Sequence, residues 1–194
     1  FNLNIYNNEI FSNTADAILI ADEVPSVGDV SDINIYNNVI YGNGRRVENG
    51  GVGVAIANNV EDVEIVNNTF ANNVQGVVIN DKNQGYNPRN ILVRNNIFSE
   101  NSFRNIYVEN ASNVTLDNNL FVNTDENADK TEIYEKGEGV ANLNVFDNEL
   151  AESVDFVNSE ANDYRLTSTS PAINIGSSSI GNYANLDKDG KQRL

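Results

Sequence analysis

Ionisable side chains follow the ends of several short apolar runs in this chain. They are Asp22, Asp81, Lys82 and Glu109. Aligning the runs places Asp22 and Asp81 in one column, with Glu109 in the column before it. Carboxylates a few ångströms apart can serve as the acid and base of glycoside hydrolysis, and they can also gather Ca²⁺, which prefers oxygen ligands. The alternative interpretation of the same column is a polar edge that only faces water.

Four arginines could bring positive charge to a bound ligand. They are Arg45, Arg46, Arg89 and Arg104. The pair Arg45-Arg46 lies in a glycine-flanked insertion, and guanidinium groups bind anionic sugars through bidentate contacts, although such a pair is also common in a solvated loop. Lys82, with Arg89 or Arg104 nearby, could instead neutralise a uronate and abstract its proton if burial lowers the pKa of the lysine.

The run Asp187-Lys188-Asp189-Gly190 begins like a calcium-binding loop. Asp187 and Asp189 are therefore candidate metal ligands, with Ca²⁺ as the candidate ion. The run lacks the distal bidentate Glu of that motif. A structural turn is the alternative.

An internal repeat must position these residues. The doublet Asn-Asn recurs at 7–8, 37–38, 67–68, 95–96 and 118–119, and as Asp-Asn at 147–148, with starts 30, 30, 28, 23 and 29 residues apart. Each doublet follows an alternating apolar run rich in Ile and Val, which is typical of strands. A period of this length indicates a solenoid, in which stacked coils share one continuous core.

Two apolar columns are expected to stack in the core of that solenoid. Their members are Leu3/Ile33/Val63/Ile91/Val114/Leu143 and Ile10/Ile40/Phe70/Phe98/Phe121/Leu150. The Asn columns are expected to be structural, because Asn tolerates the left-handed backbone conformation of a tight bend and can bond amide to amide along a stack. One Asn of each doublet should take the bend and the other the ladder, and the sequence leaves open which.

The N-V-x-I-x-N-N-x-F-x-x-N units resemble the right-handed parallel β-helix repeat of secreted polysaccharide lyases, hydrolases and epimerases. The resemblance covers residues 1–150. The later motifs D-F-V-N, N-D-Y-R-L, S-P-A-I-N-I-G and D-K-D-G-K-Q-R are similar to the closing segment of many bacterial β-helix proteins. The expected fold is therefore all-β, a right-handed parallel β-helix of about six coils over 1–150, with a C-terminal capping segment over 151–194.

Composition excludes several kinds of chemistry and partner. The chain has no Cys and no His, which removes disulfides, thiolate metal sites and the Ser-His-Asp arrangement. Its formal charge of −16 disfavours nucleic acid and anionic membrane as partners. The resemblance implies a bacterial protein that is secreted or on the cell surface, with a polysaccharide as its partner.

The first strand begins without a polar cap at Phe1-Asn2-Leu3. Solenoid ends usually carry caps, so we expect this chain to be the C-terminal part of a longer protein whose missing N-terminal coils stack on it. The expected function is part of a polysaccharide lyase, hydrolase or epimerase that binds a glycan along one face of the rod. The alternative is a non-catalytic carbohydrate-binding, adhesive or structural β-helix module.

Overall fold

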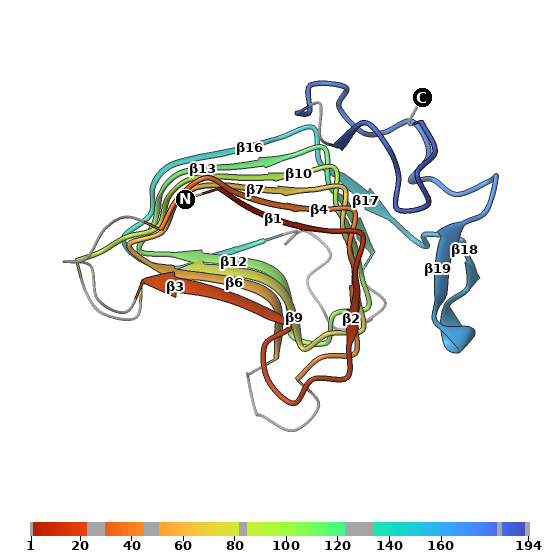
Figure 1. Ribbon diagram of the computed structural model, residues 1–194, viewed down its shortest axis with the longest axis horizontal. Coiled ribbons are helices and arrows are strands. Elements are labelled where there is room, and N and C mark those ends of the chain that lie inside the picture. The colour runs from red at the N-terminus through yellow and green to blue at the C-terminus, as the bar shows by residue number, and fades with distance from the viewer. Residues whose placement is uncertain are drawn as a thin grey trace.

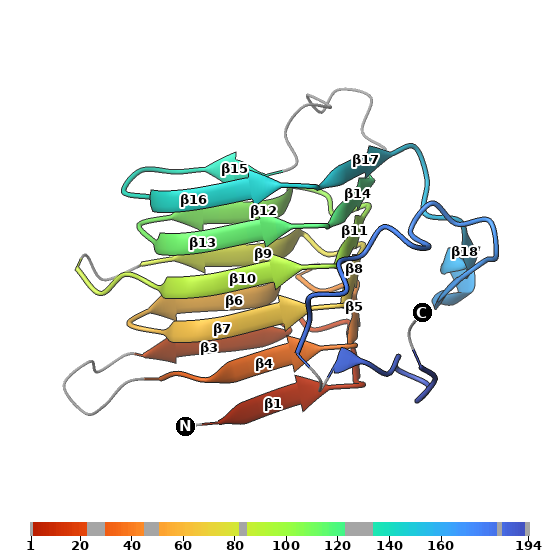
Figure 2. The ribbon, with the colours of Figure 1, turned by 90° about the horizontal axis from the view of Figure 1, so that it is seen from above.

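Parallel strands stacked into a rod dominate the computed structural model, which describes residues 2–22, 30–44, 51–81, 85–122, 134–181 and 184–192. Three sheets run along the rod (Figures 1 and 2). Sheet A contains β1 (Leu3–Tyr6), β4 (Ile33–Tyr36), β7 (Glu61–Val66), β10 (Arg89–Arg94), β13 (Ser112–Asp117) and β16 (Ala141–Phe146). Sheet B contains β2 (Glu9–Phe11), β5 (Val39–Tyr41), β8 (Thr69–Ala71), β11 (Ile97–Ser99), β14 (Leu120–Val122) and β17 (Glu149–Ala151). Sheet C contains β3 (Ile18–Asp22), β6 (Val52–Asn58), β9 (Gln75–Asn80), β12 (Arg104–Glu109) and β15 (Glu135–Lys136).

Each of the first five coils passes once through the three sheets, and the last described coil passes through sheets A and B. Within a sheet, every strand pairs in parallel with the equivalent strand of the next coil. The register follows the spacing of the sequence repeat: Ile33 pairs with Val63, and Phe70 pairs with Phe98. The expected right-handed parallel β-helix is therefore confirmed. Among the described residues, no helix is long and apolar enough to cross a membrane.

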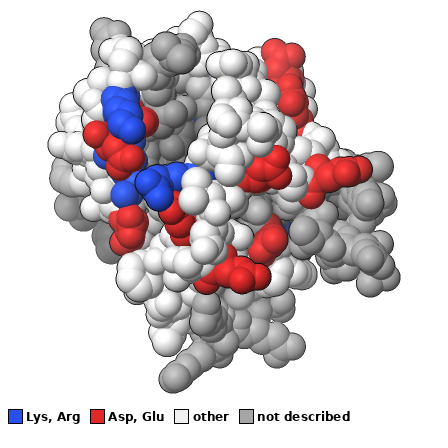
Figure 3. Space-filling view, turned by 90° about the vertical axis from the view of Figure 1, so that its right-hand side faces the viewer, with Lys and Arg blue, Asp and Glu red and all other residues white. Residues whose placement is uncertain are grey.

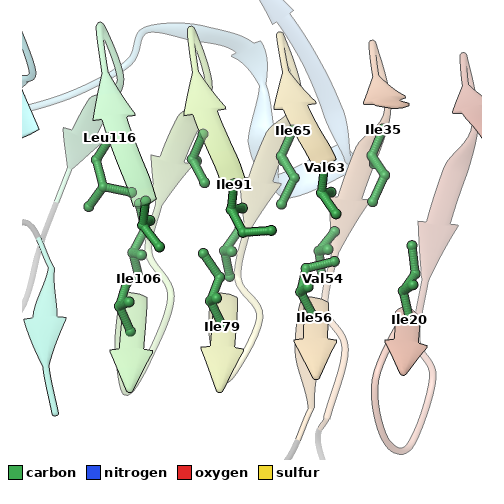
Figure 4. Close-up of a cluster of buried hydrophobic side chains, with 14 of the residues drawn as sticks. Ile20, Ile35, Val54, Ile56, Val63, Ile65, Ile79, Ile91, Ile106 and Leu116 are labelled. Atoms are coloured by element: carbon green, nitrogen blue, oxygen red, sulfur yellow. The ribbon is translucent and has the colours of Figure 1, made fainter. Parts of the chain in front are cut away.

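The core is a set of like-on-like columns inside the rod. Ile and Val side chains from sheets A and C meet across the interior (Figure 4). Phe70, Phe98 and Phe121 are fully buried, and their rings stack with centroids 4.9 and 5.0 Å apart. The expectation that each column is buried throughout is wrong at the two ends of the rod, because Leu150 is 49% exposed and Leu3, Ile10 and Leu143 are only half-buried. Leu150 lies in the last coil, where a described neighbour packs on one side only.

The structure assigns the two roles within each Asn doublet. The first residue takes the left-handed bend, with φ near +57° at Asn37 and Asn67 and +56° at Asn95. The second residue points inward and forms the ladder: Asn38 donates to Asn68, and Asn68 to Asn96, each at 3.0 Å. The side chain of the bend residue therefore points away from the core of the rod, where its carboxamide can form hydrogen bonds with a segment packed on the outside.

Two further ladders flank this one. The third Asn of the repeat forms a ladder at the far end of sheet B, where Asn43 donates to Asn73 at 2.8 Å. An exposed column with positive φ begins the strands of sheet A, and there Asn113 donates to Asn90 and Asn90 to Asp62, each at 3.0 Å. Carboxamides therefore run along three corners of the rod.

The C-terminal segment, predicted to cap the rod, runs along its flank in the described residues (Figures 1 and 2). A hairpin of β18 (Phe156–Asn158) and β19 (Asp163–Leu166), joined by the 3₁₀ turn Ser159–Ala161, packs beside sheet B. Tyr164 of this hairpin lies against Tyr41, with ring centroids 5.1 Å apart. The chain then returns along the corner between sheets A and B, and residues 167–192 are called the tail below.

Candidate functional site

The ionisable column predicted from the sequence lies at the corner between sheets C and A. Asp22 ends β3 in register with Asn58, and Glu109 ends β12 in register with Asn80. Asp81 follows Asn80 directly, so two coil steps separate Asp22 from Asp81. At the usual strand spacing, that separation is on the order of 10 Å along the rod. The register is as expected, but Asp22 and Asp81 do not lie in adjacent coils, whereas Asp81 and Glu109 do.

Asp22 and Arg89 belong to one polar network at this corner, which we call the corner network. Asn59 joins them, since its Nδ2 donates to Asp22 Oδ2 at 3.4 Å and its Oδ1 accepts from Arg89 at 2.9 Å. Arg89 also forms an ion pair with Glu61 at 2.7 Å. Asp22 is buried, and Arg89 is about one-third exposed. The network can therefore orient Arg89 while leaving part of its guanidinium open to solvent.

Asp81 is occupied by its own loop. Its Oδ2 accepts the backbone N–H of Gly85 at 2.7 Å and that of Tyr86 at 3.4 Å, and the residue is 6% exposed. A carboxylate bonded in this way closes a turn. The geometry gives Asp81 a structural role.

Glu109 and Arg104 occupy opposite ends of β12. Five residue steps along the strand separate them, roughly 16 Å at the usual rise. Arg104 stacks over Phe103 and Tyr107, with its guanidinium carbon 4.3 and 4.2 Å from the two ring centroids. Glu109 is half-buried, and its carboxylate has no hydrogen bond or ion pair within the described part of the chain. The structure therefore does not bring Arg104 to the predicted edge.

Three predicted site residues, Lys82, Arg45 and Arg46, lie outside the described residues. The two candidate metal ligands are described. Asp187 Oδ1 accepts the backbone N–H groups of Asp189 and Lys191, at 2.9 and 2.8 Å, so it closes a tight turn. Within the described ranges, no group of three or more Asp or Glu side chains is arranged to hold a metal ion.

The outer Asn column anchors the tail along the rod. Each of these carboxamides donates to a tail carbonyl: Asn37 to Leu186 at 2.7 Å, Asn67 to Ala184 at 3.3 Å, Asn95 to Ser177 at 2.8 Å and Asn118 to Ile175 at 3.1 Å. Asn95 also accepts the N–H of Ser177 at 2.8 Å. Because Asn carries both a donor and an acceptor, the bend residue binds the tail backbone from coil to coil.

A buried ion pair lies beneath this tail. Arg94 contacts Asp117 in the next coil through both Nε and an Nη atom at 2.6 Å, and it donates to the carbonyl of Ser179. The Asp117 side chain is 3% exposed, and its second oxygen accepts no hydrogen bond from the described residues. The pair thus links two coils of the rod to the tail that covers them.

Between hairpin, tail and rod lies a cleft of about 950 Å³, which we call the flank cleft. Its floor consists of outward-facing residues from successive strands of sheet B: Val39, Thr69, Ile97 and Leu120. The bend and ladder Asn residues line its inner side. The exposed apolar side chains of Leu166 and Ile173 lie at its outer wall. The flank cleft therefore combines aliphatic surface with hydrogen-bonding amides.

Charged residues gather at the end of the flank cleft nearest the first coil. Figure 3 views the molecule from the right-hand side of Figure 1 and shows basic side chains gathered on one side of that surface, among acidic ones. Lys188 pairs with Glu9 at 2.8 Å, and the hydrogen bond to Glu9 raises the pKa of Lys188. Arg165 pairs with Asp163, and this hydrogen bond lowers the pKa of Asp163 to about 2. Lys191 also lines the cleft and has no ion pair among the described residues.

Sequence reasoning missed the flank cleft. The one available signal was the outer Asn of the doublet, since a bend residue with a spare carboxamide can bind a neighbouring chain. The tail that completes the cleft meets this column through backbone atoms, which leave no pattern in the sequence.

One comparison with known protein families agrees with this architecture. The family model described as "Right handed beta helix region" matches residues 2–179. A search of solved structures matches a "putative glycosyl hydrolase" from Parabacteroides merdae ATCC 43184, with a TM-score of 0.45 and 11% identity over 78% of this chain and 79% of that one. No curated protein matches the chain.

Proposed function

This chain belongs to the right-handed β-helix family, and from that premise we propose that it is a carbohydrate-binding rod that holds an oligosaccharide in the flank cleft. The observation that carries the proposal is the cleft itself, about 950 Å³ in volume and lined by both aliphatic side chains and carboxamides. Ligand sites are concave and mostly apolar, with a few placed polar groups. Sugars offer apolar C–H faces and hydroxyl groups, and this lining suits both.

The placement of the acidic residues favours binding over catalysis. Asp81 closes a turn, and Asp22 is buried within the corner network. A glycosidase needs two carboxyl groups facing one bond, about 5 to 10 Å apart. Within the described residues, the edge offers Glu109 alone as a carboxylate without a partner. The resemblance to secreted bacterial proteins supports a location outside the cell, where polysaccharides are met.

The test is titration calorimetry against a panel of neutral and acidic oligosaccharides. Thr69→Arg fills the floor of the flank cleft, and we expect it to abolish binding. Thr115→Arg is the matched control, because Thr115 is also half-buried and outward-facing, but on sheet A and away from the cleft. Equal affinity in the two variants, with both still folded, would remove the flank cleft as the site.

A polysaccharide lyase, hydrolase or epimerase activity is the second candidate function. The unpartnered carboxylate of Glu109 and the partly exposed guanidinium of Arg89 favour it. A glutamate can act as a general base that abstracts a proton from a sugar, and a guanidinium group can bind the carboxylate of an acidic sugar. Glu109→Gln should then abolish turnover of the oligosaccharides in the panel. Turnover is measured as new reducing ends for a hydrolase or as unsaturated product for a lyase. Turnover that survives this substitution would exclude Glu109 as the catalytic group.

A further inference from the structure

The floor of the flank cleft repeats at the spacing of the coils. Val39 pairs with Thr69, Thr69 with Ile97, and Ile97 with Leu120, so each of four successive coils contributes one floor residue. Paired strands lie about 4.8 Å apart, and three such steps make the floor roughly 14 Å long. A ligand that lies along the rod therefore meets a new floor residue at each step.

This spacing discriminates between kinds of linear polymer. In an extended chain of equatorially linked pyranose sugars, each ring advances the chain by close to one strand spacing, because the two linking oxygens lie on opposite sides of the ring. An axial link bends the chain instead. An extended peptide presents a side chain to the same face at every second residue, or about every 7 Å, so its side chains do not match the coils one to one. The floor thus fits an extended glycan better than a peptide.

The inner side of the cleft offers hydrogen-bond acceptors at a multiple of the same spacing. Asn67 and Asn118 both line the cleft, two coils apart, and each uses Nδ2 to hold the tail. Among the described residues, no donor bonds to Oδ1 of either side chain. Asn95, which lies between them, uses both Nδ2 and Oδ1 on Ser177. Two free carboxamide oxygens about 10 Å apart suit hydroxyl donors on every second sugar.

The charges of the cleft favour a neutral ligand. Its charged lining residues gather at the end nearest the first coil. Acidic residues outnumber basic ones there: Glu9, Asp163, Asp187 and Asp189 against Arg165, Lys188 and Lys191. Over Thr69, Ile97 and Leu120, the described lining is aliphatic or carries amides and hydroxyl groups. A carboxylate on every sugar would lose hydration there without gaining a cation, in a chain whose formal charge is already −16.

We propose that the ligand of the flank cleft is a neutral, unbranched oligosaccharide of equatorially linked pyranoses, which lies along the rod with one sugar over each coil. The inference rests on the proposed function, because it takes the flank cleft as the carbohydrate site. It adds the class of sugar, the orientation of the chain and a length of about four sugars, one for each floor residue.

The experiment is titration calorimetry with neutral β-1,4-linked oligosaccharides of glucose, of mannose and of xylose, each from two to six sugars long. For the series that binds, we expect the affinity to rise severalfold with each sugar up to about four and then to level off, because the floor has four positions. A β-1,4-linked tetrasaccharide of glucuronate differs from the glucose compound chiefly by its charge. It should bind at least tenfold more weakly, and so should an α-1,4-linked glucose tetrasaccharide, whose axial links bend the chain.

Val39→Arg tests the match between sugars and coils. Val39 is half-buried at one end of the floor, so an arginine there fills one position. The affinity should then level off at a shorter chain than in the wild type. Thr115→Arg, on sheet A and away from the cleft, is the matched control and should keep the wild-type dependence on length. Circular dichroism melts check that both variants are folded.

The results separate failure of this inference from failure of the proposed function. If none of the neutral or acidic oligosaccharides binds, the proposed function is wrong and the inference fails with it. The inference alone is overturned if oligosaccharides bind but the glucuronate or α-linked compound binds as tightly as the neutral β-linked ones. Affinity that does not depend on chain length, or a folded Val39→Arg variant that levels off at the wild-type length, would also overturn it.

Discussion

Asn96 donates from Nδ2 to Oδ1 of Asn119 at 3.0 Å, and both side chains are buried. The same Nδ2 reaches the carbonyl oxygens of Ile65 and Arg94, at 2.8 and 2.9 Å. The Oδ1 of Asn96 in turn accepts from Asn68. One carboxamide thus joins three coils, and its polar atoms are satisfied without water.

Asn96→Leu should therefore lower the free energy of unfolding by about 1–3 kcal/mol for each buried group left without a partner. The measurement is chemical denaturation. Asn95→Gly is the control, because Gly accepts the left-handed bend and only the tail contacts of Asn95 are lost. If both substitutions lower the free energy of unfolding by the same amount, the ladder contributes no more to stability than the hydrogen bonds between Asn95 and the tail.

Phe98→Ala should lower the free energy of unfolding by about 3–5 kcal/mol, since it opens a cavity between two stacked rings. Leu150→Ala is the comparison within the same column, and its cost should be much smaller because Leu150 is 49% exposed. Denaturant midpoints of the two variants provide the test. Similar midpoints would contradict the buried stack.

The repeat was enough to predict the rod because strand register follows directly from equal spacing. The doublets at 37–38 and 67–68 are 30 residues apart, and the paired strands keep that offset. Phe70, Phe98 and Phe121 were placed in the core for the same reason. Leu150 lies in its predicted column, and only its predicted burial is wrong, because periodicity carries no information about where the stack of neighbours ends.

The candidate site was harder to predict because its contacts are distant in sequence. Asn37 and Leu186 are 149 residues apart and meet through a backbone carbonyl. A carbonyl is the same at every residue, so no side-chain pattern indicates this contact. The structural role of Asp81 could not be predicted for the same reason, since its partners are backbone N–H groups of its own loop.

Acid should weaken the Asp163–Arg165 pair of the hairpin. The hydrogen bond from Arg165 lowers the pKa of Asp163 to about 2, from an ordinary value of 3.8. A lowered pKa contributes stability above the ordinary value, and that contribution is lost as pH falls through about 2. A carboxyl-detected NMR titration should find this pKa, and Arg165→Ala should return it toward 3.8. A pKa that does not move in the variant would contradict the assignment.

Removing one partner of the buried ion pair Arg94–Asp117 should lower the free energy of unfolding more than replacing both partners by apolar residues. Arg94→Met leaves the Asp117 carboxylate buried, with its side chain 3% exposed, so we expect a loss of about 3–5 kcal/mol in the free energy of unfolding. The double variant Arg94→Met/Asp117→Leu removes the stranded charge and should recover most of that loss. Arg165→Met, in an ion pair whose arginine side chain is 71% exposed, should shift the denaturation midpoint far less. A double variant as unstable as Arg94→Met alone would show instead that Arg94 acts chiefly by holding the tail at Ser179.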